Sequence, residues 1–115
     1  VTSGGAICCP PDGAGEVLVV EPSSSPLPHT SMLSCPDDAQ RDTSRMSRWT
    51  RGALGSDGRV YCGALDGHSA LCVEPGRASA FGELPEGRSK WSDPELAGDG
   101  RLYCAPFTAT SVLVI

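Results

Sequence analysis

The chain has few aromatic side chains, no excess of positive charge and no long apolar run. Aromatic residues are only 5% of the 115 residues, so large side chains for a core are scarce. The formal net charge of −5 argues against binding to nucleic acid or an anionic membrane surface, because both are bound through basic patches. The longest apolar runs, Val17–Val20 and Val112–Ile115, are far shorter than the roughly 18 residues that span a bilayer.

Motifs of enzymes and metal sites are also missing. There is no Cys-x-x-Cys pair, no Asp-x-Asp-x-Asp-Gly loop and no Gly-x-Ser-x-Gly elbow. His29 and His68 have no recurring carboxylate or cysteine partner, so we expect both in exposed turns or loops. The sequence therefore predicts no catalytic residues, no metal and no cofactor.

Turn-forming residues are abundant, with 14 glycines and 10 prolines. This composition is typical of many short strands joined by tight turns. The chain has no initiator methionine and ends inside an apolar run at Ile115, so we expect it to be a slice of a longer protein.

One segment of the chain recurs after 42 residues. Trp49 aligns with Trp91, and Asp57–Cys62 aligns with Asp99–Cys104 with five of six residues identical. A more degraded copy lies 53 residues before the first of these, where Cys9 aligns with Cys62. Such a period indicates a repeat architecture.

Each copy predicts an antiparallel meander. Asp-Gly between apolar runs favours a hairpin with a type I′ turn, and Glu-Pro ends the strand that follows. The expected hairpin strands are 52–56 with 59–64 and 95–98 with 101–106; the expected third strands are 16–20, 70–73 and 112–115, and a weaker fourth strand is 78–82. The run Val17–Val20 suggests a strand buried on both faces.

These units divide the chain into four parts. Residues 1–22 are a degraded first unit, residues 23–47 a Ser/Pro-rich loop without period, residues 48–89 a complete unit and residues 90–115 a partial unit. The predicted fold class is all-β, with antiparallel units of three to four strands.

The repeat resembles those of known β-propellers. Its pattern is Trp-x-x-x-x-Leu-x-x-Asp-Gly-Arg-(Val/Leu)-Tyr-Cys, then Val-Leu-Val-(Ile/Val), then Glu-Pro. This is similar to the broad kelch, NHL and SMP-30/lyase-like group, and most similar to divergent repeats of uncharacterised algal and protist proteins. The resemblance implies a partial β-propeller and covers residues 1–22 and 48–115.

The candidate binding residues are the recurring tryptophans and the cations before them, Arg48 with Trp49 and Lys90 with Trp91. One interpretation is an aromatic ring on a propeller face that binds a ligand or partner, with the cations stacked nearby. The alternative is a packing aromatic that closes each unit on the next. Recurrence in register favours the packing role.

Six cysteines need a separate interpretation. Cys9, Cys62 and Cys104 share one repeat position, Cys72 replaces a valine, Cys8 replaces a tyrosine, and Cys35 lies outside the repeats. We interpret them as structural thiols, since cysteine packs as a small hydrophobic residue. A disulfide or a metal site is the alternative. Free thiols favour a reducing compartment such as the cytoplasm.

Three functions fit this sequence. The first is a module that binds a protein partner and has no catalytic activity. The second is part of a lactonase or lyase-like propeller enzyme whose central site lies mainly outside this chain. The third is a structural repeat without a ligand, and self-association through open sheet edges is a further expectation.

Overall fold

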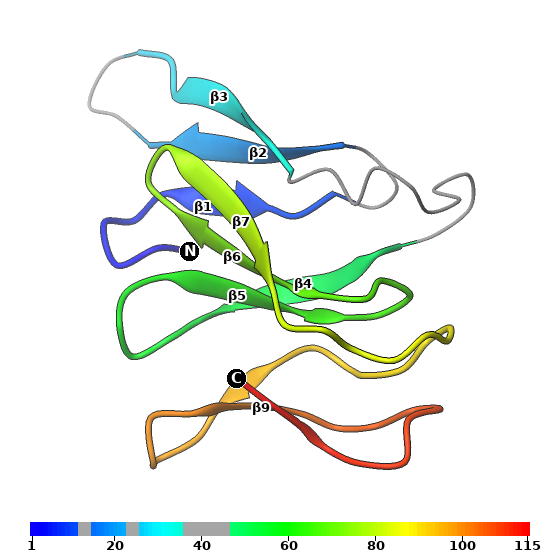
Figure 1. The fold of residues 1–115 in the computed structure, drawn as a ribbon. Coiled ribbons are helices and arrows are strands. Elements are labelled where there is room, and N and C mark those ends of the chain that lie inside the picture. Colours follow the sequence, from blue (N-terminus) through cyan, green and yellow to red (C-terminus); the bar gives the residue numbers. More distant parts are fainter. Residues whose placement is uncertain (12–14, 23–25, 36–46) are drawn as a thin grey trace.

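The computed structural model describes residues 1–11, 15–22, 26–35 and 47–115, in which every regular element is a β-strand (Figure 1). Ten strands form three separate antiparallel sheets of three, four and three strands, and none of the sheets is closed. The predicted all-β class with sheets of three to four strands is confirmed. The described residues contain no helix that could cross a membrane.

Each sheet is a meander in which strands adjacent in sequence are paired. The first sheet contains β1 (Ile7–Cys9), β2 (Glu16–Glu21) and β3 (His29–Ser34). The central sheet contains β4 (Trp49–Leu54), β5 (Val60–Ala64), β6 (Ala70–Glu74) and β7 (Arg77–Phe81). The third sheet contains β8 (Glu95–Leu96), β9 (Leu102–Cys104) and β10 (Leu113–Val114).

Two apolar layers hold the three sheets together. Val17 and Val19 of the first sheet pack with Val60, Leu71 and other residues of the central sheet. Between the central and third sheets, Ala64 packs with Trp91 and Cys104. The sheets therefore lie in chain order, with the central sheet between the other two (Figure 1).

The two Asp-Gly hairpins do not have the predicted type I′ turn. Gly55 N donates to Arg59 O at 2.8 Å and Gly58 N donates to Gly55 O at 3.1 Å, which closes a three-residue loop. Gly58 has a φ of 83° and Gly100 of 82°, whereas neither Asp57 nor Asp99 has a positive φ. A type I′ turn needs positive φ at both central residues, so the observed turn is a type I turn followed by a left-handed glycine.

A strand within the predicted loop 23–47 was missed. Residues His29–Ser34 form β3 and pair with β2 along its full length, from Glu21 to Glu16. This segment carries only two large apolar residues, Met32 and Leu33, so its strand comes from pairing with β2 rather than from a local pattern. Residues 23–25 and 36–46 of the predicted loop lie outside the described residues.

The run Val17–Val20 was predicted to be buried on both faces, but in β2 only one face is fully buried; β6 is the strand that is buried on both faces. Ala70, Leu71, Cys72 and Val73 of β6 are all buried, because a sheet lies on each side of the central sheet. In β2 burial alternates, with Val17 and Val19 buried and Leu18 and Val20 half-buried. No described segment covers the outer face of the first sheet to the same extent.

Candidate functional site

Trp49 and Trp91 are buried, with 4% and 3% of their surface exposed. The indole Nε1 of Trp49 donates to Ser69 O at 3.0 Å, and that of Trp91 donates to Ser111 O at 2.8 Å. Each acceptor lies 20 residues after its tryptophan, just before the third strand of the same sheet. Burial with a satisfied N–H gives both indoles a packing role.

The two cations lie beside the indoles they precede. The Arg48 guanidinium carbon is 5.3 Å from the Trp49 ring centroid, and Lys90 Nζ is 5.9 Å from that of Trp91. Lys90 is only 2% exposed, and its Nζ donates to Gly67 O at 2.5 Å. Burial lowers the pKa of Lys90, and the carboxylates of Asp66 and Glu86 oppose that shift. The four predicted residues thus form two separate cation–aromatic pairs.

Both indoles also line a single depression between the central and third sheets, with a volume of about 340 Å³. Arg51 N donates to Asp93 Oδ1 at 3.0 Å and joins the two sheets there. The lining comprises Ser47, Trp49, Thr50, Arg51, Leu65, Trp91, Ser92, Asp93 and Phe107. Arg48 and Lys90 do not line it.

Phe107 is the large exposed residue of this depression, with 68% of its surface accessible to solvent. Phe107 was not predicted from the sequence as a binding residue. A signal was nevertheless present, because Phe107 lies 42 residues after Leu65, which lines the same depression. Leu65 and Phe107 thus occupy equivalent positions of the repeat, and both line this depression.

The two Asp-Gly turns carry identical hydrogen bonds. Asp57 Oδ1 accepts a bond from Arg59 N at 3.0 Å, and Oδ2 accepts one from the Tyr61 hydroxyl at 2.5 Å. Forty-two residues later, Asp99, Arg101 and Tyr103 make the same two bonds. The bond to Asp57 raises the pKa of Tyr61 to about 12, and the same bond lowers the pKa of Asp57. The carboxylates of Asp57 and Asp99 therefore accept hydrogen bonds within their own hairpins.

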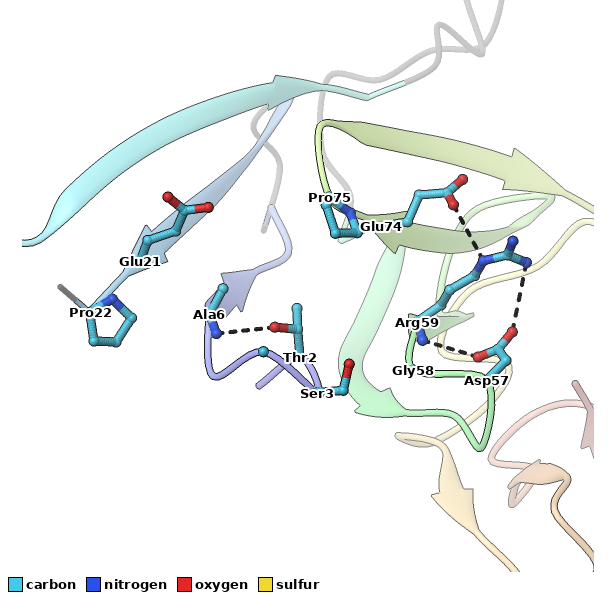
Figure 2. Close-up of a pocket in the computed structure, with 11 residues that line it drawn as sticks. Thr2, Ser3, Ala6, Glu21, Pro22, Asp57, Gly58, Arg59, Glu74 and Pro75 are labelled. Atoms are coloured by element: carbon cyan, nitrogen blue, oxygen red, sulfur yellow. Dashed lines mark hydrogen bonds and ion pairs between the residues drawn. The ribbon is translucent and has the colours of Figure 1, made fainter.

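A larger pocket of about 550 Å³ lies between the first and central sheets at the end where these turns lie (Figure 2). The pocket is lined by Thr2, Ser3, Gly4, Ala6, Glu21, Pro22, Asp57, Gly58, Arg59, Glu74 and Pro75. Figure 2 shows Arg59 held between Glu74, at 3.3 Å, and Asp57, at 3.7 Å. Its cation is therefore already paired, and no buried polar side-chain atom in the described residues lacks a partner.

All six cysteines are free thiols in the described part of the chain. Cys62, Cys72 and Cys104 are buried, as expected of structural thiols, and burial raises the pKa of Cys62 to about 12 and that of Cys104 to about 11. Cys9 is exposed although it shares a repeat position with Cys62, because it lies on the outer face of the first sheet.

The histidines are separate from these features. His29 lies exposed at the start of β3 and not in a loop, and His68 lies half-buried in the turn between β5 and β6. Among the described residues, no three His, Cys, Asp or Glu side chains are grouped as metal ligands would be.

Comparison with known proteins adds no relative to this description. No family model, curated protein or solved structure matches the chain.

Proposed function

We propose that the chain forms three consecutive units of a β-propeller-like repeat and acts as a protein-binding module without catalysis of its own. Strand equivalence supports the repeat. The sequence offset of 53 places β1 and β2 on β5 and β6, and β3 then follows β2 as β7 follows β6. The offset of 42 places β8, β9 and β10 on β4, β5 and β6. Four strands in meander order are the arrangement of a propeller blade.

Contacts between adjacent sheets also recur. Ser56 in the turn of the central sheet donates through its hydroxyl to Gly100 O in the third sheet at 3.1 Å. Ser3, 53 residues before Ser56, lies in the same way beside Gly58 of the central sheet. Equivalent contacts between successive units are what a stacked repeat requires.

The binding role rests on the depression lined by Trp49 and Trp91. Protein partners commonly anchor an apolar or aromatic side chain in a preformed hollow with a few polar groups at its edge. Here the hollow combines two fixed indoles, the exposed ring of Phe107 and the polar pair of Arg51 and Asp93. The partner class is a protein segment that presents an apolar side chain.

A displayed random-peptide library tests this proposal with the intact chain. Peptides enriched on the wild type should contain an apolar anchor and should lose roughly five- to thirtyfold in affinity for Phe107→Ala, because an anchor contact is worth roughly 1–2 kcal/mol. Phe81→Ala is the matched control, since Phe81 is an exposed aromatic residue on β7 outside the depression. Absence of enrichment, or equal loss in both variants, would refute the docking role.

A further inference from the structure

The turn before β1 has the same backbone structure as the Asp-Gly turn before β5. Thr2 N donates to Ala6 O at 2.7 Å, and Gly5 N donates to Thr2 O at 3.0 Å. Gly5 has a φ of 86°, close to the 83° of Gly58. Equivalent side chains of the two turns can therefore be compared directly. The equivalent bonds, at 2.8 and 3.1 Å, close the turn 53 positions later and join Gly55, Gly58 and Arg59.

The two turns differ in the side chains that form an ion-pair network in the central sheet. There, Arg59 lies between Glu74, at 3.3 Å, and Asp57, at 3.7 Å. The offset of 53 places Gly4 on Asp57, Ala6 on Arg59 and Glu21 on Glu74. Among the described residues, the carboxylate of Glu21 forms no ion pair or hydrogen bond. The first sheet thus keeps the glutamate of the network but has a methyl group in place of its arginine.

Ala6 and Glu21 lie on the face of the first sheet that is turned towards the central sheet. Cys8 and Val19 are paired on this face and pack in the core between the two sheets, and Ala6 packs against the same core. Side chains two positions apart along a strand share a face, so Glu21 lies on the face of Val19. Both Ala6 and Glu21 line the pocket of about 550 Å³, on the side formed by the first sheet (Figure 2). The pocket therefore occupies the place into which the equivalent of Arg59 would extend.

We infer that this pocket binds the guanidinium group of an arginine side chain that belongs to a partner protein. Glu21 accepts the guanidinium N–H groups, as Glu74 Oε2 accepts the Nε–H of Arg59 within the central sheet. A planar guanidinium matches a carboxylate better than a compact ammonium group does.

The charge of the pocket favours the same ligand. Three carboxylates line it, those of Glu21, Asp57 and Glu74, against the single cation of Arg59, so an acidic ligand is disfavoured. The formal net charge of −5 on the chain also attracts a basic partner. The inference goes beyond the proposed function, because the pocket lies between the first and central sheets and the docking depression between the central and third sheets.

An NMR titration of the intact chain with N-acetyl-arginine methylamide tests this inference, since the probe carries one guanidinium group and no carboxylate. The backbone amide signals of Ala6 and Glu21 should shift with a dissociation constant of about 1–10 mM, as expected of a single ion pair at the surface. The citrulline analogue has nearly the same shape without the charge and should cause no shift. The lysine analogue should bind roughly threefold more weakly or worse.

Substitutions locate the site. Glu21→Gln should weaken binding of the arginine probe roughly fivefold. Glu16→Gln is the matched control and should bind the probe normally, because Glu16 is an exposed glutamate at the opposite end of β2 and does not line the pocket. Phe107→Ala should also bind the probe as the wild type does, so that failure of the docking proposal is distinguishable from failure of this one.

Ala6→Arg supplies a guanidinium group from the chain itself. It should abolish binding of the probe and should raise the midpoint of urea unfolding above that of Ala6→Gln, and this gain should disappear in a Glu21→Gln background. A gain that persists without Glu21, or probe binding unchanged by Ala6→Arg, would overturn the inference. So would a wild type without shifts, a citrulline or lysine analogue that binds as tightly as the arginine probe, or equal losses in Glu21→Gln and Glu16→Gln.

Discussion

The hydroxyl of Thr50 joins two strands of the central sheet inside the protein. Thr50 Oγ1 accepts a hydrogen bond from Gly63 N at 2.8 Å and donates to Arg51 O at 2.9 Å. Thr50 is 6% exposed and Gly63 is buried. In the third sheet Ser92 makes the same bond to Ala105 N at 3.0 Å, but there the bond is open to solvent. Equivalent hydrogen bonds thus occur twice in the chain, once buried and once exposed to solvent.

Replacing each hydroxyl should have different consequences for stability. Thr50→Val keeps the side-chain shape but leaves the Gly63 amide buried without an acceptor, which costs about 1–3 kcal/mol in the free energy of unfolding. Ser92→Ala exposes the Ala105 amide to water, so only the net worth of a hydrogen bond is lost, about 0.5–1 kcal/mol. We expect the buried substitution to cost roughly 1 kcal/mol more than the exposed one.

Urea unfolding followed by tryptophan fluorescence measures both values, because both indoles are buried in the folded chain. Thr50→Ser, which keeps the hydroxyl, is the matched control and should recover most of the loss. The reasoning would be refuted by equal costs for Thr50→Val and Ser92→Ala, or by a loss in Thr50→Ser as large as that in Thr50→Val.

Three further predictions concern a glycine of the second hairpin, the thiols and Tyr61. Gly100→Ala should destabilise the fold by about 1 kcal/mol in urea unfolding, because Gly100 has a φ of 82°. Gly98→Ala in the same hairpin is the control and should be nearly neutral, because the added Cβ meets no atom within 4 Å. Similar losses of stability in the two variants would contradict this prediction. A thiol reagent added to the native protein should label exposed Cys9 quickly, and Cys62 and Cys104 only after unfolding; rapid labelling of the latter two by mass spectrometry would refute their structural role. The bond to Asp57 raises the pKa of Tyr61, so the stability from this bond should be present below a pH of about 10 and should decline towards a pH of about 12. Tyr61→Phe should flatten that decline in thermal melts recorded over this pH range. A pH profile unchanged by Tyr61→Phe would contradict this prediction.

Hairpins with their own turn chemistry could be predicted from the sequence, and a strand with little apolar pattern of its own could not. Asp-Gly between apolar runs located the β4–β5 and β8–β9 connections, although the turn type was wrong because the Asp57 side chain accepts the Arg59 amide and Asp57 keeps a negative φ. In β3, by contrast, four of the six residues are polar and only Met32 and Leu33 are large and apolar. The strand is recognised by its pairing with β2. The local sequence pattern alone therefore did not predict this strand.

The sequence predicted individual residues of the candidate site but not the depression that they line. Recurrence singled out Trp49 and Trp91, but the depression that they share arises only when two sheets pack together, 42 residues apart in sequence. Phe107 was missed because its significance depends on exposure at that junction. The cations illustrate the same limit, since identical positions in the repeat place Arg48 half-buried and Lys90 almost fully buried.

The packing and binding interpretations of the tryptophans are compatible. A residue that binds a partner loses less conformational entropy when its rotamer is already fixed, and this lowers the cost of association. Trp49 and Trp91 are fixed by burial and by bonds to Ser69 O and Ser111 O, while one part of each indole still lines the depression. A packing aromatic that closes one sheet on the next thus also forms a rigid wall of the proposed docking site. Phe107 is not fixed by burial, so its substitution separates binding from folding.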